Sequence, residues 1–123
     1  MAVKVLGVFK AATDTRDVPA GTVIFEAGST GDEMYGVAEG KVELRLPDGR
    51  AVTVGPDETF GEMALVDTSP RSATATALED SKLAVIDKRR FLFLVHETPT
   101  FALQVMASLA ERLRAMQAGE GAT

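Results

Sequence analysis

The chain has 123 residues, a formal net charge of −5 and no cysteine. A chain of this length forms one domain that can fold without a metal or a disulfide, and the missing cysteine excludes thiolate metal sites and cysteine nucleophiles. The acidic balance argues against a nucleic-acid partner, and no apolar run reaches the roughly 18 residues of a membrane span, so we expect a soluble, cytoplasmic protein.

Short strands are predicted for most of the chain, after an N-terminal stretch with at most a turn or two of helix over residues 3–10. From about residue 22 to residue 87, short apolar runs alternate with glycine, proline and aspartate, which is typical of an all-β domain. We expect strands at residues 23–25, 34–38, 42–46, 72–77 and 83–86, with a return strand from residue 52 after the Pro47-Asp48-Gly49 turn. The hairpin-like connections predict a small jelly-roll fold.

Helices are predicted after Asp87. This residue is a suitable N-cap for a helix over residues 88–96, whose basic first turn we expect to be solvated, and Thr98 precedes a second helix with Pro99 at its first position. Apolar residues then recur in steps of four and three, at Ala102, Met106, Leu109, Leu113 and Met116. This spacing places them on one face, which we expect to pack on the domain itself; a short coiled-coil seam is the alternative.

The domain is expected to occupy residues 1–117, followed by a small, polar and flexible tail at residues 118–123. His96 is the only histidine. We expect it to be exposed or to cap a helix end, because a metal-dependent β-roll enzyme needs several such ligands. No metal is therefore expected.

The segment from Phe60 to Ala77 has the composition of an anion site. Gly61 to Val66 can form a short helix directly after a strand, with glycine at its entry so that a ligand can approach the backbone. The free N–H groups of such a helix start attract an anion. Arg71 follows Pro70 and could return to this helix start, where its guanidinium would add a charge-assisted contact to a phosphate.

Glu62 does not fit a plain phosphate site, because two anions repel each other. Its carboxylate fits a neighbouring sugar hydroxyl, since a ribose 2′-OH can donate to it. One anionic phosphate beside one free ribose hydroxyl describes a 3′,5′-cyclic nucleotide. The alternative for Glu62 and Arg71 is an ordinary salt bridge between them at the mouth of a hairpin.

The same segment resembles the phosphate-binding cassette of the cyclic-nucleotide-binding domain family: Phe60-Gly61-Glu62, an apolar residue, a small residue and Leu65, then Pro70-Arg71-Ser72-Ala73-Thr74. Residues 21–28 and 31–40 resemble the early β-roll turns of that family, and the likeness extends from about residue 19 to residue 114. The resemblance implies a mainly β fold, an eight-stranded jelly-roll-like β-roll with a short cassette helix and flanking N- and C-terminal helices. It suggests a stand-alone, bacterial-type member.

The resemblance also implies roles for individual residues. Arg71 would bind the exocyclic phosphate oxygens and Glu62 the ribose hydroxyl, while backbone amides near Met63, Ala64 and Ser72 would complete the phosphate cradle. Gly61 is also expected among the ligand-binding residues. Serine at position 72 favours cAMP over cGMP, because threonine there accompanies cGMP binding. Arg112 falls where bacterial cyclic-nucleotide-gated channels carry a base-capping arginine, which makes it the candidate lid over the purine. A solvated arginine near a helix end is the alternative.

We therefore expect a protein that binds cAMP or cGMP and acts as a ligand-switched regulatory module rather than as an enzyme. Its other partners would be a downstream effector protein and, weakly, a second copy through the C-terminal helix, but neither nucleic acid nor membrane. One alternative is a regulatory domain cut from a larger cAMP-dependent transcription factor, kinase or channel. Another is a small β-roll enzyme, which is disfavoured because no nucleophile–base pair is evident.

Overall fold

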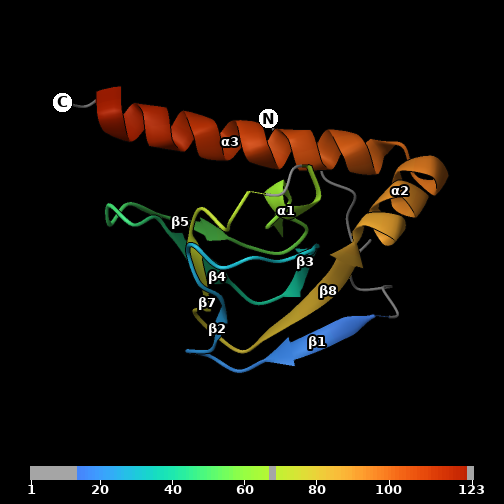
Figure 1. Ribbon diagram of the computed structural model, residues 1–123, viewed down its shortest axis with the longest axis horizontal. Helices are drawn as coiled ribbons and strands as arrows, with labels where there is room; N and C mark the ends of the chain where they lie inside the picture. Colours follow the sequence, from blue (N-terminus) through green and yellow to red (C-terminus); the bar gives the residue numbers. More distant parts are fainter. Residues whose placement is uncertain (1–13, 67–68, 122–123) are drawn as a thin grey trace.

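The strands form two antiparallel sheets in the computed structural model, which describes residues 14–66 and 69–121 (Figure 1). One sheet has the order β1-β8-β3-β6 and the other the order β2-β7-β4-β5. The strand bounds are β1 Thr15–Val18, β2 Val23–Phe25, β3 Glu33–Glu39, β4 Val42–Arg45, β5 Ala51–Val54, β6 Thr59–Phe60, β7 Thr74–Ala77 and β8 Ser81–Asp87. The expected eight-stranded, mainly β fold is confirmed within these residues.

Two strands, β1 and β6, were missed by the sequence pattern. Strand β1 lies at the edge of its sheet and has only one buried residue, Val18, so it carries no apolar alternation. Strand β6 is only the pair Thr59 and Phe60, which is too short for a period-2 pattern. The other predicted strands are present within a residue or two of their expected bounds.

Strand β3 has both faces buried because the molecule has two apolar layers. Tyr35 and Val37 point between the sheets and join the core of the β-roll. Met34 and Ala38 point the other way, into a second cluster that includes Phe101 of the C-terminal helix. The sheet that contains β3 and β8 is thus covered by helices on its outer face, which explains the almost continuous apolar runs of these strands.

The helices are α1 Met63–Val66, α2 Lys88–Glu97 and α3 Thr100–Gly121. Asp87 caps α2 as expected, since its Oδ1 accepts from the backbone N–H of Arg90 at 2.8 Å. The backbone of α3 continues beyond residue 117, where we placed the end of the domain, and the expected helix over residues 3–10 lies outside the described residues. Within the described residues, no helix combines the length and apolar character needed to cross a membrane.

The orientation of α3 contradicts the expectation that its apolar stripe packs on the domain. Met106 and Leu113 are more than half exposed, whereas Gln104 and Ser108 are buried. Of the rest of the stripe, Ala102 and Leu109 are partly buried, and the side chain of Met116 is outside the description.

The reason is a set of polar partners offered by the β-roll. Gln104 donates from Nε2 to the carbonyl of Asp57, and Arg112 donates to the carbonyl of Thr59 at 2.7 Å. Helix α3 therefore docks with a mixed face, which buries Phe101 and Val105 beside Gln104 and Ser108, and part of its apolar stripe points outward. In Figure 1 the helix lies along one side of the roll, next to α1.

Candidate functional site

The cassette, residues 60–77, leaves the core of the roll at a left-handed glycine. Gly61 follows β6 with a φ of +80°, which side chains rarely tolerate, and for this reason the short helix α1 begins at Met63 rather than at Gly61. A Cβ atom at Gly61 would also lie 3.0 Å from Nη1 of Arg71. The glycine thus permits both the turn and the close approach of the arginine.

Arg71 is a buried cation without a counterion among the described residues. Its residue is 8% exposed. Nη1 donates to the carbonyl of Gly61 at 2.9 Å and Nη2 to the carbonyl of Glu33 at 2.8 Å. The guanidinium carbon lies 4.1 Å from the centre of the Phe25 ring. Its Nε is buried and has no hydrogen-bond partner in the described structure.

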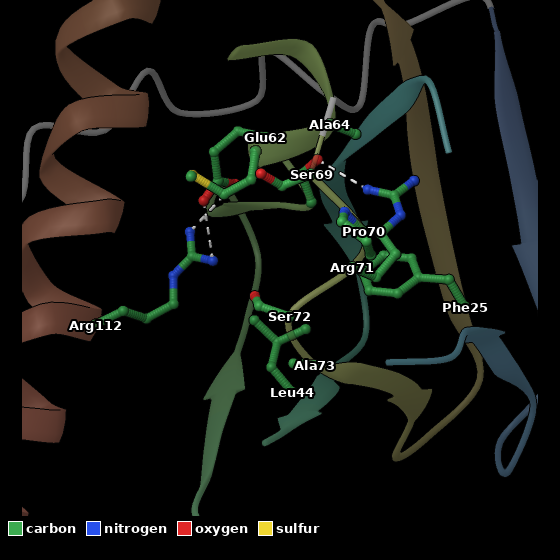
Figure 2. A pocket seen from close by; sticks show the side chains of 12 residues that line it. Phe25, Leu44, Glu62, Ala64, Ser69, Pro70, Arg71, Ser72, Ala73 and Arg112 are labelled. Atoms are coloured by element: carbon green, nitrogen blue, oxygen red, sulfur yellow. Dashed lines mark hydrogen bonds and ion pairs between the residues drawn. The ribbon is translucent and has the colours of Figure 1, made fainter. Parts of the chain in front are cut away.

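Glu62 pairs with Arg112 of α3, not with Arg71. The distance from Arg112 Nη1 to Glu62 Oε1 is 3.3 Å, and that from Nη2 to Oε2 is 3.5 Å. Figure 2 shows Arg112 reaching from α3 to Glu62, while Arg71 lies on the other side of the site beside Phe25. The alternative of a Glu62–Arg71 salt bridge is therefore wrong, and Arg112 reaches the site with its guanidinium engaged by Glu62.

All seven candidate residues line one cavity: Gly61, Glu62, Met63, Ala64, Arg71, Ser72 and Arg112. Its volume is about 60 Å³. Pockets for small molecules usually occupy roughly 300–1,000 Å³, so this one is too small for a nucleotide unless its wall moves. Arg112 forms the wall of the cavity nearest to α3, because its side chain projects from α3 toward Glu62 of the cassette (Figure 2).

The cavity is also lined by residues that were not among the candidates: Phe25, Leu44, Ser69, Pro70 and Ala73. The last three lie inside the cassette, and their proximity to the candidates could have revealed them. Phe25 and Leu44 come from predicted strands, but their position depends on which strands pair, and no local pattern contains that information.

The backbone N–H groups of the cassette are used unequally. That of Ala64 donates to the carbonyl of Gly61 at 3.3 Å, in the turn that starts α1. Those of Met63 and Ser72 donate to no backbone carbonyl within the described residues. Two of the three expected backbone donors are therefore available to a ligand.

Glu33, which holds Arg71 through its carbonyl, is itself held by a polar network. Its Oε1 accepts from the hydroxyl of Tyr35 at 3.1 Å and lies 3.6 Å from Nη2 of Arg16. Burial and the charge of Glu33 raise the pKa of Tyr35, and Arg16 partly opposes the shift. The network fixes the segment that presents its carbonyl to Arg71.

The residues that the structure describes include no group of three or more histidine, aspartate or glutamate side chains placed to hold a metal ion. His96 is exposed at the end of α2, and its Nδ1 lies 3.0 Å from Glu97 Oε2. The expected exposure of His96 is confirmed.

Comparisons with known proteins point to one family. The family model for the cyclic nucleotide-binding domain matches residues 15–98. The cyclic AMP receptor protein of Thermus thermophilus is 40% identical over 101 residues, which are 78% of this chain and 47% of that protein. The chain spans about half the length of the first curated relatives it matches.

Solved structures agree with this family. The crystal structure of the Thermus thermophilus catabolite activator protein superposes with a TM-score of 0.70 at 37% identity, covering 88% of this chain and 53% of that one. A structure from a cyclic-GMP-dependent signalling pathway that regulates bacterial phytopathogenesis has a TM-score of 0.68 at 31% identity, covering 82% of this chain and 84% of that one.

Proposed function

Because the chain belongs to the cyclic nucleotide-binding domain family, a family of regulatory binding domains, we propose that its ligand is cAMP and that the cassette cavity holds it. Arg71 binds the exocyclic phosphate oxygens, with the backbone N–H groups of Met63 and Ser72. The carboxylate of Glu62 accepts a hydrogen bond from the ribose 2′-OH. Arg112 and α3 respond to the ligand and pass its state on.

The observation that carries this proposal is the buried, uncompensated charge of Arg71. Burying a cation away from water is costly unless it is paired. The carbonyls of Gly61 and Glu33 take one N–H each from Nη1 and Nη2, which leaves the Nε–H and one N–H on each Nη without an acceptor in these contacts. A phosphate supplies the missing negative charge and two acceptor oxygens in the geometry that a guanidinium prefers.

Glu62 narrows the class of proposed ligands from any phosphate to a phosphate that carries a neighbouring sugar hydroxyl. The carboxylate is buried in the cavity and can accept more hydrogen bonds than Arg112 donates to it. A sugar hydroxyl next to the phosphate can use the remaining capacity. A bare phosphate or a sulfate would instead be repelled by this carboxylate, since the two negative charges lie close together.

The small volume of the cavity supports a switch that involves α3. A nucleotide cannot enter while Arg112 occupies the wall, so the ligand-bound state requires a shift of Arg112 and its helix. The ligand drives this shift only by binding the shifted state more tightly. Phe101 is buried against Phe91 at a centroid distance of 5.6 Å, and with Leu94 it belongs to the apolar cluster that repacks when α3 moves.

The preference for cAMP over cGMP rests on Ser72 and on the named ligand of the Thermus thermophilus relative. The side chain of Ser72 is exposed at the cavity, where it can meet the base or the phosphate but lacks the methyl group of threonine. Parallel calorimetric titrations with cAMP and cGMP decide the preference.

The test of the ligand is calorimetric titration of the wild type and of Arg71→Ala with cAMP. Losing a buried phosphate partner costs about 2–5 kcal/mol, which weakens binding about 30-fold to several-thousand-fold. Arg114→Ala, an exposed arginine of the same α3, serves as the control and should bind like the wild type. Equal affinities of the wild type and Arg71→Ala would refute the assignment.

We propose a binding protein and not an enzyme, because the family is one of regulatory binding domains. Prolonged incubation with cAMP and cGMP should leave both nucleotides intact; conversion of either would overturn this. The alternative is that the chain is the sensing part of a longer cytoplasmic regulator, because it spans about half the length of the curated relatives it matches. A downstream protein or domain would then read the position of α3.

The outward apolar face of α3 supports weak self-association. Leu103, Met106 and Leu113 are each about half exposed and follow steps of three and seven, so two copies of the helix can align these residues across a two-fold axis. The short length of the stripe makes the dimer weak. Sedimentation velocity should show concentration-dependent association that Met106→Glu abolishes and Arg114→Ala preserves. A wild type that stays monomeric at every concentration would exclude the dimer and leave an effector as the partner.

A further inference from the structure

Phe25 is the aromatic residue closest to the proposed phosphate site. It ends strand β2, and its ring lies against the flat face of the Arg71 guanidinium, with 4.1 Å between the guanidinium carbon and the ring centre (Figure 2). Its ring belongs to the lining of the cavity. A contact of this kind attracts a cation to the electron-rich face of the ring.

The Phe25 ring is itself held by other rings. Its centre lies 6.2 Å from that of Tyr35 and 6.0 Å from that of Phe60, and these two rings are 5.3 Å apart. The three residues come from strands β2, β3 and β6, so the group joins the two sheets. Side chains packed in this way have little rotational freedom, and Phe25 therefore presents its face to Arg71 in one orientation.

The direction of this contact matters for the hydrogen-bond donors of Arg71. A guanidinium donates its N–H groups in its own plane, whereas an aromatic ring contacts it from above. The ring therefore stabilises the charge without using a donor. A carboxylate at the same place would hold the charge equally well but would occupy the N–H groups that a phosphate needs.

The backbone closes the other sides of Arg71. A Cβ atom at Gly31 would collide with the guanidinium, and one at Gly61 would lie 3.0 Å from its Nη1. The carbonyls of Gly61 and Glu33 hold one N–H on each Nη. Phe25 is the only aromatic ring recorded over the guanidinium within the described residues.

We propose that Phe25 is a positioning residue for phosphate recognition. It holds the guanidinium of Arg71 by its face in the ligand-free protein and keeps the in-plane Nε–H and Nη–H donors directed at the ligand. This inference rests on the proposed function, because the phosphate it serves is that of the cyclic nucleotide.

The affinity test compares Phe25→Leu and Phe25→Met, which keep an apolar side chain without a ring, with Phe25→Tyr, which keeps the ring. Calorimetric titration with cAMP should show about 3- to 30-fold weaker binding for the first two and little change for the third. Ile24→Val is the matched control, because Ile24 precedes Phe25 in β2 and packs against the same apolar core but is not part of the cavity lining.

Two phosphorothioate analogues of cAMP, in which sulfur replaces one or the other exocyclic oxygen, distinguish a positioning role of Phe25 from a purely structural role. The wild type should distinguish them, because Arg71 contacts the oxygens unequally from a fixed position. Phe25→Leu should bring the affinity ratio of the two analogues closer to one, whereas Ile24→Val should leave the ratio unchanged. A ratio in Phe25→Leu equal to that of the wild type overturns the proposal, as does a Phe25→Tyr variant as weak as Phe25→Leu.

Nuclear magnetic resonance of the ligand-free protein provides a reading that needs no nucleotide. The Nε–H proton of Arg71 should resonate upfield of that of the exposed Arg114, because it lies over an aromatic ring, and Phe25→Leu should remove this shift. An unshifted Arg71 signal in the wild type overturns the inference even if cAMP binds. Conversely, a shifted signal in a protein that binds no cyclic nucleotide refutes the proposed function while the Phe25–Arg71 contact stands.

Discussion

Replacing Arg112 with alanine should destabilise the ligand-free protein by about 3–5 kcal/mol, the usual cost of removing one partner of a buried ion pair. The side chains of Arg112 and Glu62 are 16% and 5% exposed, and their closest N–O distance is 3.3 Å. At an effective dielectric constant of about 20, that distance corresponds to roughly 5 kcal/mol of attraction before desolvation. Alanine also removes the hydrogen bond to the carbonyl of Thr59.

Urea unfolding and thermal unfolding measure this effect. For a domain of this size, the loss corresponds to a Tm lower by roughly 10–20 °C. Arg114→Ala is the matched control, because it removes an exposed arginine two residues farther along α3, and its free energy of unfolding should stay within about 0.5 kcal/mol of the wild type.

A double-mutant cycle separates the ion pair from general effects on the helix. In a Glu62→Gln background the buried carboxylate is gone, so Arg112→Ala should cost clearly less than in the wild type, with a coupling of about 1–3 kcal/mol. Equal costs in the two backgrounds would refute the pair as the main link between α3 and the cassette, as would an Arg112→Ala variant as stable as the control.

Three further substitutions test separate parts of the structure. Gly61→Ala should weaken cAMP binding in calorimetry, because the φ of +80° disfavours a side chain and the added Cβ would crowd Arg71. Gly21→Ala is the control: its φ is +88° but the space around it is open, so this variant should be less stable and still bind cAMP normally. Phe101→Ala should lower the free energy of unfolding in urea by about 3–5 kcal/mol, whereas Leu103→Ala, at an exposed position, should lower it by about 0.5 kcal/mol or less. Similar losses in the two variants would contradict the observed orientation of α3. Burial raises the pKa of Tyr35 above its ordinary 10.0, so the contribution of Tyr35 to stability is complete below about pH 10 and is lost as the pH rises through its pKa in the folded protein. The free energy of unfolding of the wild type should therefore fall between about pH 9 and about pH 11, and Tyr35→Phe should lack this loss.

The parts of the fold that the sequence predicts are those with a local cause. Alternating residues predict β4, and the side chain of Asp87 predicts the start of α2, because both depend on neighbours in the chain. The face of α3 that packs inward depends instead on carbonyls of the distant β5–β6 region, which bind Gln104 and Arg112. An apolar stripe identifies a helix face but not the surface that will cover it.

In the candidate site, too, features with a local cause could be predicted and contacts between distant residues could not. The cassette residues are contiguous, so their spacing and the family resemblance identified them together. The partners of the two charged side chains are far apart in the chain: Glu62 meets Arg112, and Arg71 meets the ring of Phe25. Spacing alone had left open an ordinary salt bridge between Glu62 and Arg71 as the alternative to a ligand site. Burial decides otherwise, since α3 brings a second arginine to the carboxylate and the aromatic cluster holds the first one away from it.

If the proposed function holds, the distribution of charge in the site links ligand binding to the outer surface of the molecule. Within the described residues Glu62 is neutralised by Arg112 of α3, while the hydrogen-bond partners of Arg71 are backbone carbonyls rather than a carboxylate. The proposed nucleotide would bring one negative charge to Arg71 and one hydroxyl donor to the acceptor capacity that Arg112 leaves unused on Glu62, and its volume would displace Arg112 from the cavity wall. Because Arg112 is one of the polar contacts that hold α3, weakening its pair with Glu62 releases the helix that carries the exposed Met106 and its apolar neighbours. In the proposed switch, a single carboxylate would thereby couple the sugar of the ligand to the surface through which the protein would meet its partner.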